Sequence, residues 1–192
     1  MNIVIFGPPG AGKGTQSKFI VEKYNLCQLS TGELLRREIK DNTSLGQKIS
    51  SIINSGNLVS DEIVTDLIEK FISNNDYKNR LVFDGYPRNL SQAKKLDELL
   101  KNDNQKVDLV LKLSVSLEII KKRIIERRNQ ENRSDDSENI AIKRFQNYEN
   151  NIKPVIDFYK QANLLRVVDG EGSISKINNE IGVLIESIKG WL

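Results

Sequence analysis

The chain has no histidine and one cysteine among its 192 residues. Without histidine, imidazole acid–base catalysis and metal sites built on histidine are excluded. The single cysteine, Cys27, cannot form a disulfide within the chain, which is typical of a protein from a reducing compartment. We therefore expect Cys27 to be a small, buried apolar residue.

Long apolar runs and an excess of one charge are also missing. No segment approaches the ~20 apolar residues of a membrane span, and the N-terminus lacks the features of a signal peptide. The 29 Lys and Arg against 26 Asp and Glu leave a net charge of +3, which is too balanced to indicate a nucleic-acid-binding surface. We expect a soluble, cytoplasmic protein that binds neither membrane nor nucleic acid.

Short runs rich in Val, Ile and Leu alternate with helical periodicity along the chain. Strands are predicted over residues 2–6, 27–29, 81–84, 107–115 and 165–169. Helices are predicted over residues 13–24, 31–40, 45–55, 61–73, 91–101, 117–128, 138–161 and 174–189. This alternation predicts an α/β fold, with a five-stranded parallel sheet and helices on both of its faces.

Two segments depart from the simple alternation. Residues 31–59 carry two consecutive helices with no strand between them, which predicts a helical insertion. Ser30 and Glu33 have the spacing of a capping box, so the first of these helices should begin at Thr31. Residues 129–136 are wholly polar and predict a mobile loop. Pro154 should kink or divide the helix over 138–161.

Residues 7–15 read Gly-Pro-Pro-Gly-Ala-Gly-Lys-Gly-Thr, directly after an apolar run. Glycines let the backbone curl so that its N–H groups point inward, and the following helix directs its positive end to the same place. Lys13 is spaced to reach the β- and γ-phosphates. Gly14 stands where Ser or Thr is usual, so Thr15 must supply the hydroxyl that faces Mg²⁺. The segment predicts binding of a nucleoside triphosphate.

A second motif, Asp84-Gly85-Tyr86-Pro87-Arg88, follows the predicted strand 81–84. Ligands of an open α/β sheet lie beyond the carboxyl ends of its strands. Asp84 is thus placed to hold Mg²⁺ through water, and the turn after it would hold Arg88 over the edge of the sheet. Taken alone, the motif could equally be an Asp-Gly turn with an exposed arginine.

Arginines form a third group at Arg123, Arg127, Arg133 and Arg144. Arg123 and Arg127 are four residues apart and share a helix face. The transition state of phosphoryl transfer spreads negative charge over equatorial oxygens. Arginine suits that charge because its planar fork binds two oxygens at once. A solvated helix face is the alternative interpretation for an isolated pair.

Together these motifs resemble those of adenylate kinases, which convert ATP and AMP to two ADP. Residues 7–16 resemble the family's P-loop, including the shifted threonine, and 84–88 resemble its signature, with Tyr86 where phenylalanine is more usual. The other segments that resemble the family are its monophosphate-site helix at 30–36, the loop that closes that site at 56–59 and the turn that touches the ATP base at 170–173.

The resemblance implies a residue set for each nucleotide. For ATP the set is Gly10, Ala11, Gly12, Lys13, Gly14, Thr15, Arg123, Arg127 and Gly172. For AMP, whose adenine edge Gln92 would read, the set is Thr31, Arg36, Asn57, Leu58, Val59, Gly85, Tyr86, Pro87, Arg88, Gln92, Arg133 and Arg144. The implied catalytic residues are Lys13, Arg88, Arg123, Arg133 and Arg144, and Mg²⁺ would lie near Thr15 and Asp84, largely through water.

The resemblance also implies a three-layer P-loop NTPase fold and a monomer. The core would comprise residues 1–29, 60–125 and 137–192, with an AMP-binding lobe over 30–59 and a short lid over 126–136. Long-lid relatives often carry four zinc-binding cysteines in the lid, whereas this segment has neither cysteine nor histidine. We therefore expect no structural zinc.

Two other functions remain open at this point. UMP and CMP kinases resemble this chain but typically have alanine in place of Thr31 and asparagine in place of Gln92. A glutamine amide can pair with the adenine edge, so both residues favour AMP. A non-catalytic nucleotide-binding module on the same fold is the second alternative. A nucleic-acid-dependent ATPase fits less well, because few aromatic residues are available for stacking.

Overall fold

Five parallel strands form one sheet in the computed structural model, which describes residues 1–131 and 137–189. Their spatial order is β2-β3-β1-β4-β5. The strands are β1 (Ile3–Phe6), β2 (Cys27–Ser30), β3 (Leu81–Asp84), β4 (Leu109–Ser114) and β5 (Leu165–Asp169). The predicted α/β fold with a five-stranded parallel sheet is confirmed.

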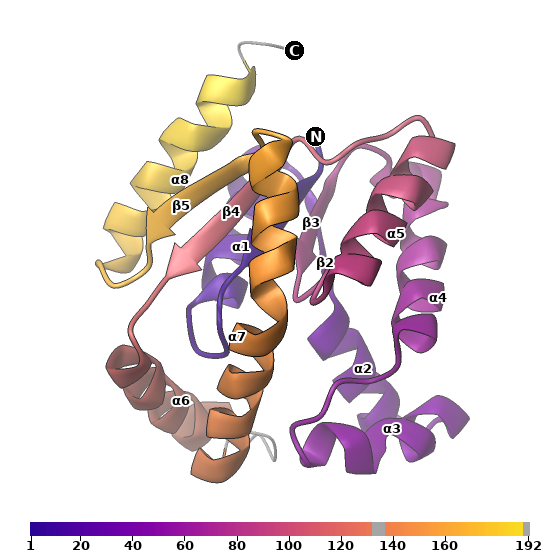
Figure 1. The fold of residues 1–192 in the computed structure, drawn as a ribbon, viewed down its shortest axis with the longest axis vertical. Helices are drawn as coiled ribbons and strands as arrows, with labels where there is room; N and C mark the ends of the chain where they lie inside the picture. The colour runs from indigo at the N-terminus through magenta and orange to yellow at the C-terminus, as the bar shows by residue number, and fades with distance from the viewer. Residues whose placement is uncertain (132–136, 190–192) are drawn as a thin grey trace.

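Helices cover both faces of this sheet (Figure 1). They are α1 (Lys13–Tyr24), α2 (Thr31–Lys40), α3 (Ser44–Asn54), α4 (Asp61–Ile72), α5 (Leu90–Asn102), α6 (Leu117–Glu131), α7 (Glu138–Gln161) and α8 (Ile174–Lys189). A short 3₁₀ helix, η1 (Asn75–Tyr77), lies between α4 and β3 and was not predicted. The helical periodicity of the sequence thus predicted the α-helices. A 3₁₀ helix of one turn is too short to give a periodic pattern, so η1 could not be predicted in this way.

The alternation of side chains along β1 creates two hydrophobic cores. Val4 and Phe6 face a core built with α4, α5 and α7, whereas Ile3 and Ile5 face a second core built with α1 and α8. Successive side chains of a strand point to opposite faces, so a strand covered on both sides must be apolar throughout. The three-layer arrangement follows from this burial. Most of β5 is exposed, because it is an edge strand.

The α2–α3 insertion and α6 lie at the same end of the molecule, on either side of α7 (Figure 1). The arrowheads of β4 and β5 point toward this end, so these helices flank the region beyond the carboxyl ends of the strands. The predicted start of α2 is confirmed, since the Ser30 hydroxyl accepts a hydrogen bond from the Glu33 N–H at 3.4 Å. The insertion is thereby anchored directly to the end of β2.

One local prediction was wrong in part: residues 129–131 belong to α6 rather than to a loop, and the remainder of the predicted loop, 132–136, lies outside the described residues. Of the two outcomes predicted for Pro154, a kink or a division of the helix, the division does not occur, because α7 continues through Pro154 to Gln161. Proline removes one helical hydrogen bond, and here Val155 and Tyr159 are fully buried on the same helix. Tertiary packing therefore stabilises α7 against that loss.

Gly46 and Gly182 form a matched pair for testing how tightly the insertion packs. A Cβ on Gly46 in α3 would overlap the carbonyl oxygen of Glu38, whereas one on Gly182 in α8 would lie 3.2 Å from the flexible end of Lys23. We predict that Gly46→Ala lowers the free energy of unfolding by about 1–3 kcal/mol. Gly182→Ala should raise it by up to about 1 kcal/mol through helix propensity. Urea unfolding checks both values, and equal effects would contradict the close approach of α2 and α3.

Candidate active site

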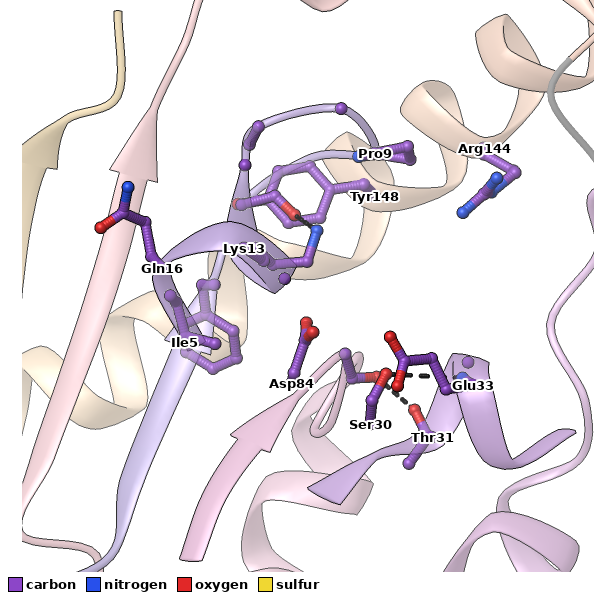
Figure 2. A pocket seen from close by; sticks show the side chains of 18 of the residues that line it. Ile5, Pro9, Lys13, Gln16, Ser30, Thr31, Glu33, Asp84, Arg144 and Tyr148 are labelled. Carbon is purple, nitrogen blue, oxygen red and sulfur yellow. Dashed lines mark hydrogen bonds between the residues drawn. The ribbon is translucent and has the colours of Figure 1, made fainter. Parts of the chain in front are cut away.

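A cleft of about 890 Å³ is lined by the loop after β1, the α2–α3 insertion and parts of α6, α7 and α8. Figure 2 shows side chains from several of these elements turned toward one another. The predicted site residues that line it are Gly10, Ala11, Gly12, Lys13, Gly14, Thr15, Thr31, Arg36, Asn57, Leu58, Val59, Asp84, Gly85, Pro87, Arg88, Gln92, Arg123, Arg127, Arg144 and Gly172. The fold therefore brings together residues from both predicted nucleotide sets.

Among the predicted site residues that the structure describes, Tyr86 is not part of that lining. It is completely buried, and its hydroxyl donates to the Gln92 carbonyl oxygen at 3.2 Å. Burial raises the pKa of Tyr86 to about 12, so its phenol remains a hydrogen-bond donor at neutral pH. Tyr86 thus supports the site from within the core. Arg133 lies outside the described residues.

The loop between β1 and α1 has the backbone conformation expected of a phosphate cradle. Gly10 and Gly12 have φ values of +82° and +95°, a region that residues with a Cβ rarely adopt. A Cβ on Gly10 would also lie 3.0 Å from Cγ1 of Ile124, so α6 packs directly on the loop. Gly12 is the N-cap of α1, and the first N–H groups of that helix and its dipole favour an anion there.

Lys13 lies folded against this loop (Figure 2). Its ammonium group donates to the carbonyl oxygens of Gly7 at 2.7 Å and Pro8 at 3.0 Å. Burial lowers the pKa of Lys13 to about 8; Asp84 opposes that shift, and Arg88 adds to it. Arg144 and Arg127 lower the pKa further. The protein thus holds Lys13 where its charge is disfavoured until an anion binds.

Asp84, the last residue of β3, is a carboxylate that lines the cleft. Gln28 holds it in place, since Nε2 donates to Oδ2 of Asp84 at 3.1 Å. A Cβ on Gly14 would lie 4.0 Å from the same oxygen, so glycine leaves open space between α1 and the carboxylate. The exposed Thr15 lines the same part of the cleft. Carboxylate and hydroxyl oxygens are suitable ligands for Mg²⁺ or for its bound waters.

The turn after β3 organises the opposite wall through one carbonyl group. The Gly85 oxygen accepts from Oγ1 of Thr31 at 3.0 Å and from Nε of Arg88 at 2.7 Å. Gly85 has φ +79°, and a Cβ there would lie 3.3 Å from both side chains. The conformation therefore favours glycine, and the close approach leaves little room for a larger residue. The two bonds fix Thr31 and Arg88 relative to each other.

Arginines complete the cleft from α6, α7 and α2. Arg123 donates from Nη2 to the Gly170 oxygen at 2.8 Å and from Nη1 to the Ala11 oxygen at 3.3 Å. It thus joins α6 to the phosphate loop and to the turn that follows β5. Arg127 and Arg144 line the cleft from α6 and α7, and Arg36 lines it from α2. Their convergence makes the site suitable for a polyanion.

Sequence reasoning missed three residues that hold this arrangement. Gln28 orients Asp84, and Asn147 in α7 donates from Nδ2 to the oxygen of Gly56, the first residue of the loop at 56–59, at 3.0 Å. Asp61 in α4 accepts from Gln92 Nε2 at 2.7 Å. These contacts join elements far apart in the chain, and no local spacing indicated them. The described residues contain no group of three or more His, Cys, Asp or Glu that could hold a metal ion.

None of the helices in the described part of the chain is long and apolar enough to cross a membrane.

The fold and the cleft are those of a P-loop protein that transfers phosphoryl groups between nucleotides. A family model described as adenylate kinase matches residues 5–164. The match covers most of the chain, from β1 to just before β5.

Curated relatives agree with this match over nearly the whole chain. An adenylate kinase of Pelagibacter ubique is 41% identical and covers 97% of this chain and 100% of its own. One from Maricaulis maris is also 41% identical, over 97% and 99%, and one from Porphyromonas gingivalis is 40% identical, over 98% and 97%. The chain belongs to the adenylate kinase family and is a nucleoside monophosphate kinase.

The lowered pKa of Lys13 predicts a specific pH dependence of stability. The folded protein releases this proton near pH 8, and the unfolded chain releases it near 10.5, so the unfolded state holds more protons between these values. Lys13 should therefore make the free energy of unfolding of the wild type increase as pH rises through this window. Lys13→Met lacks this increase. We predict that, without nucleotide, the free energy of unfolding of Lys13→Met falls relative to that of the wild type from pH 8 to pH 10.

Urea titrations of both proteins across this range measure the difference. Lys18→Met is the control, because it removes another lysine of α1 that lies beyond the loop at residues 7–15. The prediction is contradicted if the difference between Lys13→Met and the wild type is constant with pH.

Proposed function

We propose that this chain transfers the γ-phosphoryl group of ATP to AMP, giving two ADP, and catalyses the reverse reaction. The observation that carries this proposal is the composition of a single cleft. At one end it has the phosphate loop with Lys13, and at the other it has Thr31 and Gln92, which favour an adenine monophosphate. Its volume of about 890 Å³ is large for a ligand pocket, which supports occupancy by two nucleotides.

The chemistry requires no histidine. An AMP phosphate oxygen is already an anionic nucleophile, so no strong general base is needed. The transferring group passes through a state whose charge lies on peripheral oxygens, and positioning and cationic stabilisation supply most of the rate. In our proposal Lys13, Arg88, Arg123 and Arg144 provide those charges, and Arg133 completes the set.

We assign the donor nucleotide to the phosphate loop together with Thr15, Arg123, Arg127 and Gly172. The acceptor occupies the wall formed by Thr31, Arg36, Asn57, Leu58, Val59, Gly85, Pro87, Arg88 and Gln92, with Tyr86 behind it. Residues 30–59 act as the monophosphate lobe and 126–136 as the lid. Closure of both over bound nucleotides would exclude water and so prevent hydrolysis of ATP.

Mg²⁺ accompanies ATP in this proposal. The oxygen-rich corner near Thr15 and Asp84, with the space beside Gly14, fits a hydrated ion. When bound, the ion neutralises phosphate charge and orients the phosphates. Asp84, held by Gln28, would position its water ligands. We further propose a cytoplasmic monomer without a structural zinc ion.

Initial rates with Mg-ATP and each of AMP, CMP, UMP and GMP test this function. We predict a clear preference for AMP, with ADP as the product of both nucleotides. A preference for CMP or UMP would instead indicate a pyrimidine monophosphate kinase. Tight ATP binding without transfer to any acceptor would indicate a non-catalytic module.

Arg36 and Arg37 offer a matched test of the acceptor site, because they are neighbours in α2 and Arg36 alone of the two lines the cleft. Arg37 instead forms an exposed ion pair with Asp41 at 3.6 Å. We predict that Arg36→Ala lowers kcat/KM for AMP by about tenfold to a hundredfold, the range of a lost charge-assisted hydrogen bond. Arg37→Ala should leave it unchanged. Steady-state kinetics at saturating ATP measures this, and equal effects of the two substitutions would count against the assignment.

A further inference from the structure

We propose that Asp61 is a positioning residue that determines which base the acceptor site prefers, by fixing the orientation of the Gln92 amide. This inference rests on the proposed function. Asp61 is the first residue of α4, and it is not among the residues that line the cleft. It acts from behind the cleft wall, through Gln92, which is 3% exposed and does line it.

Both ends of the Gln92 amide have a partner in the protein. Nε2 donates to Oδ1 of Asp61 at 2.7 Å, and Oε1 accepts from the backbone N–H of Arg88 at 2.7 Å. A carboxylate only accepts hydrogen bonds, and a backbone N–H only donates them. A flipped amide would place oxygen against oxygen at Asp61 and N–H against N–H at Arg88. The two partners therefore permit one orientation.

The surrounding bonds hold Asp61 itself in place. Nδ2 of Asn89 donates to Oδ1 and Oδ2 of Asp61, both at 3.0 Å. Asn89 is also the N-cap of α5, and its Oδ1 accepts from the Gln92 N–H at 2.8 Å. The carboxylate thus connects the start of α4 to the start of α5. Its two oxygens are used by Gln92 and by the residue that caps the helix carrying Gln92.

The fixed orientation leaves a defined pattern for a ligand. An amide has two N–H groups and two lone pairs on oxygen, and the protein uses one of each. The remaining N–H matches a ring nitrogen acceptor of adenine, and the remaining lone pair matches its 6-amino group. Hypoxanthine has a 6-oxo group and a protonated N1, which is the reverse pattern on a purine of nearly the same size. Asp61 therefore favours AMP over IMP.

The competing explanation is that Asp61 serves only the helix, because an acidic residue in the first turn stabilises the helix dipole. Glu62 separates the two explanations. It occupies the same first turn of α4, and its side chain is exposed. Asp61→Asn and Glu62→Gln each remove one negative charge from that turn with almost no change in size. The hydrogen bonds to Asn89 and Gln92 belong to Asp61 alone of this pair.

The experiment compares kcat/KM for AMP and IMP at saturating Mg-ATP in the wild type, Asp61→Asn and Glu62→Gln. The side-chain amide of asparagine at position 61 can offer Gln92 either a donor or an acceptor. Residue 61 then no longer penalises the flipped orientation of the Gln92 amide. We expect Asp61→Asn to lower the AMP/IMP ratio by about tenfold, the effect of one hydrogen bond to a charged group. The change should appear mainly in KM for AMP rather than in kcat, and Glu62→Gln should keep the wild-type ratio.

Thermal unfolding of each protein accompanies the kinetics. An unchanged AMP/IMP ratio in Asp61→Asn overturns the inference, whether or not its melting temperature falls, because only a helix role would then remain. An equal loss of selectivity in Glu62→Gln overturns it as well. If the wild type phosphorylates neither AMP nor IMP, the proposed function itself fails, so the two failures are distinguishable.

Discussion

Burial of the Lys13 ammonium group in a cleft that also holds several arginines is the constraint on which the site depends. Burial is the main cause that lowers the pKa of Lys13; Asp84 opposes this shift, and Arg88, Arg144 and Arg127 add to it. Such an arrangement is unfavourable for the protein without a ligand and becomes favourable when polyphosphate enters. In the proposed function, this arrangement prepares the site for charge that develops in the transition state, as expected where electrostatic preorganisation drives catalysis.

Backbone carbonyl groups around the cleft help to hold its cations. Gly7 and Pro8 offer their carbonyl oxygens to Lys13, and the Gly85 and Gly170 oxygens accept from Arg88 and Arg123. Each of these three cations therefore donates to at least one neutral carbonyl dipole. Glycine is favoured at Gly85 because its φ is +79° and because a Cβ there would lie 3.3 Å from each of the two side chains that share its carbonyl oxygen.

The parts of the fold and site that could be predicted from the sequence are those determined by local spacing. Buried strands, amphipathic helices and the glycine pattern of residues 7–15 each depend on residues close together in the chain. The end of α6 was misjudged because Asn129 and Gln130 are polar, although a surface helix can continue through such residues. Whether Pro154 would divide α7 could not be decided from the sequence, because the packing that keeps the helix continuous involves distant segments.

The contacts that sequence reasoning missed join distant segments, and the link from Asp61 to Gln92 is the clearest case. An acidic residue at the start of a helix has a sufficient local explanation in the dipole, so nothing in its neighbourhood indicates a second role. The residues that follow β3 combine two structural roles. The Arg88 side chain lines the cleft, whereas its backbone N–H holds the Gln92 amide. In the proposed function, one short turn thus serves charge stabilisation through the Arg88 side chain and base recognition through the Arg88 backbone.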